Sequence, residues 1–125
     1  MINLANRKEV FKIIGDSIPK EQTDAIYVFG SYLTKFFGDN SDIDVAWFPN
    51  TLITEIDRID LELLLKDKLG VDVDLILPSK DKFYSLLGNV LSGEPVGYMS
   101  YEFSEWFDLN VCRIMDEYNF LQERM

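Results

Sequence analysis

Residues 28–47 read VFGSYLTKFFGDNSDIDVAW, and this stretch decides how the chain folds. The apolar run over residues 26–29 predicts a buried strand that stops at Gly30. We expect Ser31 to cap a short helix that continues to Phe37. A Gly-Asp-Asn-Ser turn then leads to a second apolar run. The pattern therefore predicts two neighbouring strands joined through a short helix and a turn.

The second predicted strand, residues 42–48, carries two carboxylates among apolar residues. Asp42 and Asp44 are two positions apart, so both side chains leave the same face of a strand. Carboxylates this close repel each other unless a cation lies between them. The start of the preceding helix offers free N–H groups that suit a phosphate. The combination indicates chemistry on a nucleoside triphosphate. The alternative is that these residues have only a structural role, as a Gly-Ser turn followed by an acidic edge strand.

A third carboxylate is available on a later strand. Residues 71–77 read VDVDLIL and lie between Gly70 and Pro78, which predicts a short strand. Asp72 and Asp74 share one face of that strand, and the aliphatic residues share the other. Either acid can supply the third carboxylate beside Asp42 and Asp44. The alternative is that both line a solvated face of the sheet.

Four residues carry a family resemblance. Gly30, Ser31, Asp42 and Asp44 match the G-S-x10-D-x-D signature of the DNA polymerase β-like nucleotidyltransferases, and the short chain resembles their minimal form, the MNT family. The resemblance covers residues 5–93. It implies the nucleotidyltransferase fold of the α/β (α+β) class, a small mixed sheet flanked by helices, here with a long C-terminal helix.

The resemblance also implies a metal site and a third catalytic acid. The family places that acid after a valine and before two aliphatic residues. The run VDLI at residues 73–76 fits this pattern, so we assign Asp74 and leave Asp72 as an outer acid. The implied catalytic residues and metal ligands are thus Asp42, Asp44 and Asp74, holding Mg²⁺ (or Mn²⁺) with ATP as the substrate.

The phosphate-binding segment departs from the family at three positions. Gly30 and Ser31 are in place for binding ATP phosphates, as the resemblance implies. The family then has a small residue, an arginine and a glycine, where this chain has Leu33, Thr34 and Lys35. A bidentate arginine contact to phosphate is therefore missing. Lys35 either contacts phosphate as a point charge or is an ordinary solvated lysine.

Composition predicts one globular domain, residues 1–125. The family resemblance implies a catalytic core over about 5–93, and apolar periodicity predicts a C-terminal helix over about 101–124. Hydrophobic residues make up 47% of the 125 residues, enough for one real core. We expect no membrane span and no secretory signal. A lone cysteine, Cys112, suits a reducing cytoplasm, and the absence of histidine argues against zinc.

The net charge of −10 argues against stable nucleic-acid binding. It suits a protein that binds metal ions or a basic partner. From Phe83 onward the chain has two arginines against seven acids. This acidic C-terminal third either docks a basic protein or is simply a solvated face.

The remaining elements follow from caps and periodicity. We expect helices over residues 5–18, over 54–69 with Thr54 as its cap and Gly70 as its stop, from Ser79 onward, and over 101–124, with a loop at 94–97.

Resemblance to MNT antitoxins implies a function. Many MNT proteins are encoded beside a HEPN-domain ribonuclease toxin, so the implied reaction is transfer of AMP from ATP to a tyrosine of that toxin. Two alternatives stay open. The chain acts as an antitoxin by binding alone, or it modifies a small molecule in the manner of the aminoglycoside nucleotidyltransferases.

Overall fold

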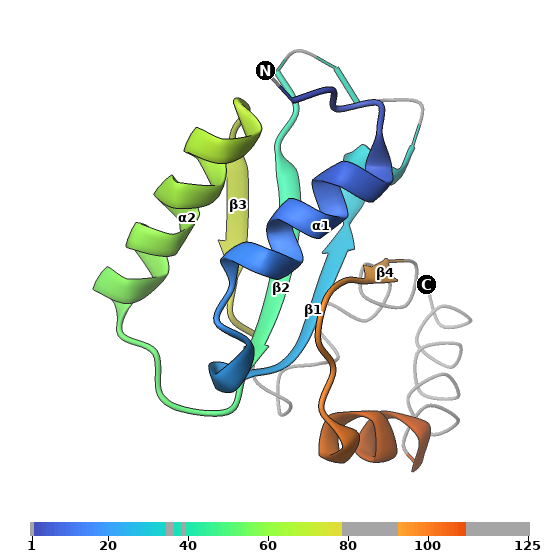
Figure 1. Ribbon diagram of the computed structural model, residues 1–125, viewed down its shortest axis with the longest axis vertical. Helices are drawn as coiled ribbons and strands as arrows, with labels where there is room; N and C mark the ends of the chain where they lie inside the picture. The colour runs from blue at the N-terminus through green and yellow to red at the C-terminus, as the bar shows by residue number, and fades with distance from the viewer. Residues whose placement is uncertain (1, 35–36, 39, 79–92, 110–125) are drawn as a thin grey trace, which may run out of the picture.

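The computed structural model describes residues 2–34, 37–38, 40–78 and 93–109. Helices and strands alternate along these residues (Figure 1). In chain order they are α1 (Arg7–Ser17), η1 (Lys20–Gln22), β1 (Thr23–Phe29), η2 (Gly30–Leu33), β2 (Ile43–Pro49), α2 (Glu55–Leu69), β3 (Val73–Ile76) and β4 (Glu94–Pro95). Residues 101–109 are also helical.

The four strands form one mixed sheet in the order β3-β2-β1-β4. β1 pairs antiparallel with β2 and with β4, whereas β2 and β3 run parallel. The expected α/β class with a small mixed sheet is therefore confirmed. The expected loop over residues 94–97 is wrong in part, because Glu94 and Pro95 pair with Val28 and Tyr27 of β1.

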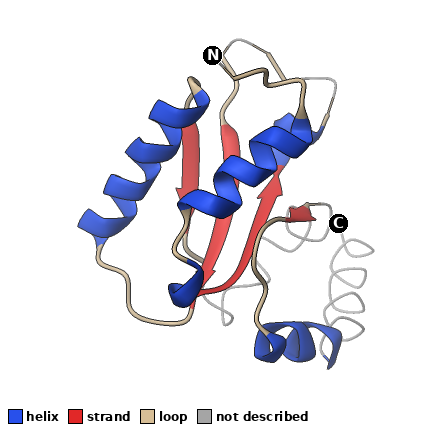
Figure 2. Ribbon diagram, viewed as in Figure 1, coloured by secondary structure: helices blue, strands red, loops and turns tan. Residues whose placement is uncertain are grey.

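Helices α1 and α2 cover one face of the sheet (Figure 2). α1 begins at the cap Asn6, whose side chain accepts a hydrogen bond from the Glu9 N–H. Its inward residues Val10 and Ile14 are fully buried. The main core joins both helices to alternate residues of the central strands. Its buried members are Val10, Ile14, Ile18, Ile26, Val28, Tyr32, Ile43, Val45, Trp47, Leu65, Leu69, Val73, Leu75 and Val96.

The ends of α2 follow the expected caps. The Thr54 side chain accepts a hydrogen bond from the Asp57 N–H, and Gly70 ends the helix in the left-handed region with a φ of 72°. Leu65 and Leu69 face the core. The helix and its two caps are therefore confirmed.

A second, smaller core lies on the other face of the sheet. It contains aromatic residues of β1 and β2 together with Phe103 from the helical residues 101–109. The Phe103 ring lies 5.0 Å from that of Phe48 and 6.3 Å from that of Tyr27, measured between centroids. The C-terminal helix thus begins by packing on the face opposite α1 and α2.

Several expectations fall outside the described residues: Lys35, the helix from Ser79, Cys112, and the C-terminal helix beyond residue 109. Within the described parts of the chain, no helix is long and apolar enough to cross a membrane.

Candidate active site

Two of the predicted acids lie side by side on the neighbouring parallel strands β2 and β3. Asp44 of β2 is in register with Asp74 of β3. Asp42 precedes β2 and lies two residues before Asp44. The Ile43 N–H donates to the Asp72 carbonyl at 3.0 Å, so the strand pairing is already established at this end. The fold therefore brings Asp42, Asp44 and Asp74 together near the ends at which β2 and β3 begin.

The pleat of β2 separates acids from core. Ile43 and Val45 are fully buried against α1 and α2. Asp44 shares the other face with Ala46 and Phe48, which belong to the smaller core. The same alternation buries Val73 and Leu75 and leaves Asp72 and Asp74 exposed. The acids consequently lie on the face that α1 and α2 do not cover.

Gly30 lies directly against Asp44. It follows Phe29, the residue of β1 that is in register with Asp44. Its φ of 82° lies in the left-handed region, and a Cβ added there would overlap Asp44 Oδ2. Only glycine meets both conditions without strain. The Gly-Ser turn thus places the backbone beside the carboxylate.

The helix after Gly30 differs from the expectation. It is a single 3-10 turn, Gly30–Leu33, preceded by Phe29 and without a side-chain cap. The Thr34 N–H and hydroxyl both donate to the Ser31 carbonyl, at 2.9 and 2.8 Å, and end the helix there. The prediction that Ser31 caps a helix through Phe37 is therefore wrong. Ser31 instead lies within the turn, partly exposed next to Gly30.

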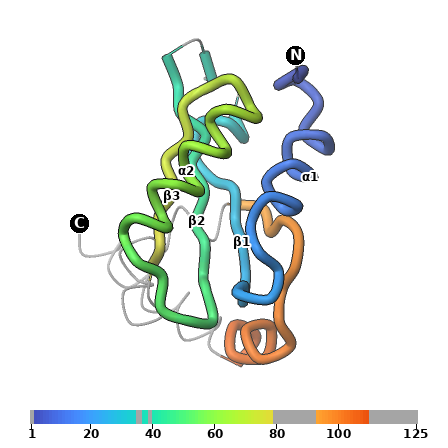
Figure 3. Tube along the Cα trace, turned by 60° about the vertical axis from the view of Figure 1, so that its left-hand side comes forward, coloured from blue at the N-terminus to red at the C-terminus, as the bar shows by residue number. Residues whose placement is uncertain are grey.

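Tyr32 fixes this turn to the rest of the molecule. Its side chain is buried, and its hydroxyl donates to the Leu4 carbonyl at 2.6 Å. The Tyr32 ring makes edge-on contacts with the rings of Phe11 and Phe37, at 6.3 and 5.1 Å between ring centroids. The start of the chain therefore lies at the same end of the molecule as the start of β2, where Asp42 and Asp44 are found (Figure 3). Sequence reasoning missed this anchor, because the Leu4 contact is not local.

Electrostatics around Asp44 are unfavourable to its charge. Burial, then the neighbouring Asp74 carboxylate, then Asp42 raise its pKa above the ordinary value. In the part of the chain that the structure describes, every salt bridge is formed within α2, so none compensates these acids. A bound cation would relieve this repulsion.

The donor set suits a hard divalent cation, because all three side chains are carboxylates. Among residues 2–34, 37–38, 40–78 and 93–109, however, no three acidic, cysteine or histidine side chains are close enough together to form a ready metal site. Like charges oppose a closer arrangement as long as no cation is present. The three carboxylates would have to move closer together to share an ion.

The family model for "Polymerase beta, Nucleotidyltransferase" matches residues 12–96. This range contains the Gly-Ser turn and all three acids. The chain belongs to this nucleotidyltransferase family.

One relative of this chain is a protein adenylyltransferase. The chain is 39% identical over 71 residues to the protein adenylyltransferase MntA of Shewanella oneidensis. The match covers 57% of this chain and about half the length of that relative, 50%.

Solved structures are similar over nearly the whole chain. One is a toxin-antitoxin complex with AMP-PNP, at a TM-score of 0.63 and 28% identity over 95% of this chain and 91% of that chain. Another is a tri-AMPylated Shewanella oneidensis HEPN toxin in complex with an MNT antitoxin, at a TM-score of 0.59 and 28% identity over 96% and 89% of the two chains.

In this nucleotidyltransferase, side chains of α2 hold the outer edge of β3. Glu62 Oε2 accepts a hydrogen bond from the Leu75 N–H at 2.9 Å, and Arg58 Nη1 donates to the Leu75 carbonyl at 3.0 Å. Arg58 and Glu62 are also paired at 3.1 Å. The backbone N–H and carbonyl of Leu75, on an outer strand of the sheet and directly after Asp74, are thus both hydrogen-bonded. Sequence reasoning missed this contact, although the i,i+4 spacing of the two side chains is visible.

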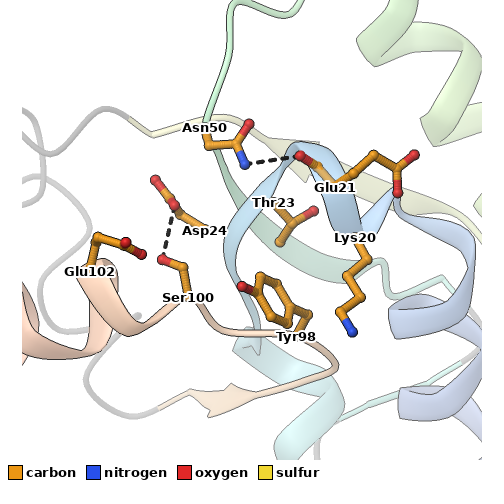
Figure 4. A pocket seen from close by; sticks show the side chains of 8 residues that line it. All are labelled: Lys20, Glu21, Thr23, Asp24, Asn50, Tyr98, Ser100 and Glu102. Atoms are coloured by element: carbon orange, nitrogen blue, oxygen red, sulfur yellow. Dashed lines mark hydrogen bonds between the residues drawn. The ribbon is translucent and has the colours of Figure 1, made fainter.

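A cavity of about 610 Å³ lies at the opposite end of β1 (Figure 4). Asp24 accepts a hydrogen bond from the Ser100 hydroxyl there at 2.9 Å, and Lys20 lies over the Tyr98 ring at 5.1 Å. Its lining residues are Lys20, Glu21, Thr23, Asp24, Asn50, Tyr98, Ser100 and Glu102. Three of these lining residues are acids, and Asp42, Asp44 and Asp74 are not among them, so the cavity is separate from the candidate active site.

Proposed function

We propose that this chain is an antitoxin that transfers AMP from ATP to a tyrosine hydroxyl of a partner HEPN-domain toxin, in a reaction that depends on a divalent metal ion. The observation that carries the proposal is the register of Asp44 with Asp74, beside Asp42 and Gly30. The relatives that crystallise as toxin–antitoxin complexes support the choice of partner.

Three acids would hold the metal. Asp42, Asp44 and Asp74 supply only oxygen donors, which suit Mg²⁺ or Mn²⁺. When bound, such ions neutralise phosphate charge and make a hydroxyl more acidic. The raised pKa of Asp44 supports this assignment, because the site is destabilised until a cation enters it.

The chain's own residues orient ATP and move the proton. Gly30 and Ser31 contribute backbone and hydroxyl groups at the turn beside Asp44, where the triphosphate would lie. Lys35 is a further candidate for a phosphate contact. The tyrosine oxygen attacks the α-phosphorus, the bond to the pyrophosphate oxygen breaks, and Asp74, exposed at the end of this face, accepts the hydroxyl proton. The products are the AMP-tyrosine ester and pyrophosphate. Because the proposed reaction consumes ATP, we expect it to take place in the cytoplasm.

The test is a transfer assay with intact mass spectrometry. The purified chain, ATP and Mg²⁺ are incubated with the toxin encoded beside it, and we expect the toxin to gain one or more AMP units. The variant Asp42→Asn with Asp44→Asn should lose the transfer, whereas Asp16→Asn at an exposed position of α1 should keep it. A toxin left unmodified by the wild-type chain rejects the proposal.

Neutralisation by binding alone is the second candidate. Two observations favour it: Leu33 and Thr34 stand in the segment where the family has its small residue and arginine, and the described acids are not assembled as a ready metal site. A toxin that stays inhibited by the Asp42→Asn, Asp44→Asn variant would establish this function in place of catalysis.

A further inference from the structure

Exposed apolar side chains lie on the outer side of α2 and in the loop before it. Leu52 is 98% exposed, Ile56 72% and Leu63 55%. Ile59 and Leu64 are also exposed, so residues 52–64 contribute most of the large apolar side chains that the described residues leave to solvent. Ile56, Ile59 and Leu63 follow the spacing of one helix face. Contiguous exposed apolar residues of this kind mark a binding surface.

An acidic row lies beside these apolar residues. Asp57, Asp60 and Asp67 are exposed, and among the described residues none of them forms a salt bridge. Asp60 and Asp67 lie next to Ile56 and Leu63 around the helix, and Asp57 lies further round, toward Leu61. The outer side of α2 therefore combines apolar and negative groups.

The cations of α2 do not neutralise that row. Arg58 is bonded to Glu55, Glu62 and the Leu75 carbonyl. Lys66 lies 3.9 Å from Glu62, and Lys68 donates to the Ser17 hydroxyl of α1 at 3.0 Å. All three cations are engaged with other groups, so the negative charge on the outside is left for another molecule.

A cavity of about 400 Å³ opens between this acidic row and the core. Buried Trp47 and partly buried Leu61 form its apolar wall, and exposed Asp57 and Asp60 lie at its rim. An apolar wall with carboxylates at its rim suits a lysine or arginine side chain that lays its apolar stem against the wall and keeps its cationic tip at the rim. The complete lining is Ser17, Pro19, Gln22, Trp47, Ile53, Asp57, Asp60, Leu61 and Leu64.

We infer that the outer side of α2 docks a basic, amphipathic segment of a partner protein. Apolar residues of that segment lie on Ile56, Ile59 and Leu63, and one lysine or arginine enters the cavity at Asp57 and Asp60. A second copy of this chain is a poor occupant, because it would bring its own acidic row and a net charge of −10 to the contact.

This surface lies on the side of the sheet away from the acids, since α2 covers the face opposite Asp44. Docking and chemistry therefore use separate surfaces. The inference rests on the proposed function in one respect only, which is that the partner is the HEPN-domain toxin that accepts AMP.

The experiment measures binding without chemistry. Binding of the toxin is measured without ATP by titration calorimetry, in an Asp42→Asn, Asp44→Asn background. Asp57→Lys with Asp60→Lys reverses the charge at the cavity, and Ile56→Ser with Leu63→Ser removes the apolar contact. The matched control is Glu102→Lys with Glu105→Lys, which changes the net charge equally at another exposed acidic place.

We expect each α2 double variant to raise Kd about tenfold or more, and the control to raise it less than about threefold. Thermal melts accompany each variant, and only variants with wild-type melting are compared. Equal losses in the control, or an unchanged Kd in both α2 variants, overturn the inference. A wild-type dimer in sedimentation that Ile56→Ser with Leu63→Ser dissociates also overturns it, because the occupant is then a second copy.

The two proposals fail in different ways. If AMP transfer depends on Asp42 and Asp44 while the α2 variants bind normally, only the docking inference fails. If the toxin does not bind the wild-type chain at all, the partner in the proposed function is wrong, and the docking assignment fails with it. In the intact enzyme, Asp57→Lys with Asp60→Lys should raise KM for the toxin and leave kcat unchanged.

Discussion

Asp44 of β2 lies directly opposite Asp74 of β3 in the parallel register of the two strands. Asp42 adds a third charge two residues away, and the pKa of Asp44 is raised by burial, by Asp74 and by Asp42. A fold that holds like charges together sacrifices stability at this place, and such sites are commonly functional.

Replacing Asp44 by asparagine should stabilise the metal-free protein at neutral pH. Because the folded state raises the pKa of Asp44, it binds the proton more tightly than the unfolded state, and stability falls as pH rises from the ordinary value of 3.8 through the folded pKa. We expect Asp44→Asn to melt roughly 2–5 °C higher at pH 7, with the difference vanishing below that ordinary value. Scanning calorimetry at both pH values checks this, with Asp60→Asn as the control. A lower melting temperature at pH 7 would show that the carboxylate contributes to folding.

Mg²⁺ or Mn²⁺ should raise the melting temperature of the wild-type chain and not that of Asp44→Asn, since the variant lacks a central ligand. Equal shifts in both proteins would place the ion elsewhere.

Three glycines allow a graded test of the turn beside Asp44. Gly30 has a φ of 82° and no room for a Cβ, Gly70 has a φ of 72° with open space, and a Cβ at Gly38 meets nothing. We expect alanine at Gly30 to cost about 2–4 kcal/mol and to abolish transfer, because it displaces the Asp44 carboxylate. Alanine at Gly70 should cost about 1 kcal/mol with activity retained, and alanine at Gly38 almost nothing. Denaturant unfolding and the transfer assay give both quantities. An active Gly30→Ala enzyme would separate the turn from the chemistry.

The two acids at β3 should differ in importance. Both are exposed, but Asp74 is the one in register with Asp44. Asp74→Asn should therefore lower kcat by a factor of about 100 or more, whereas Asp72→Asn should lower it less than about tenfold. Steady-state rates with a fixed toxin concentration decide this, and the reverse order would reassign the third acid to Asp72.

Glu62 should contribute more to stability than its neighbour Glu55. Glu62 accepts from the Leu75 N–H and from Arg58, whereas Glu55 is an exposed partner of Arg58. We expect Glu62→Ala to cost about 2 kcal/mol, because it leaves the N–H of an edge residue without a side-chain acceptor. Glu55→Ala should cost less than about 0.5 kcal/mol. Urea unfolding measures both, and Glu62→Gln, which retains an acceptor oxygen, should fall between them. Equal costs would mean that solvent replaces the Glu62 contact.

Local patterns predicted most of the elements that carry the site. The acids of β2 and β3 alternate with Val45 and Leu75, and this period-two pattern is enough to place them on the face of the two strands away from the main core. Caps at Thr54 and Gly70 likewise defined α2 to within one residue. These signals are local, so a sequence carries them directly.

The contacts that the sequence did not reveal are those between distant segments. The short turn after Gly30 ends because Thr34 bonds back to Ser31, a choice that apolar periodicity does not express. The bonds from Tyr32 to Leu4 and from α2 to Leu75 depend on how the elements pack. β4 is only two residues long, too short for any periodic pattern to define.

The alternation of acid and aliphatic residues in β2 also acts as a safeguard during assembly. A slip of one position against its neighbours would turn Asp44 into the main hydrophobic core and move Val45 to the opposite face of the sheet. A chain with the wrong strand register would therefore lose both folding stability and the arrangement of the acids. The stable register is the one that also forms the candidate active site.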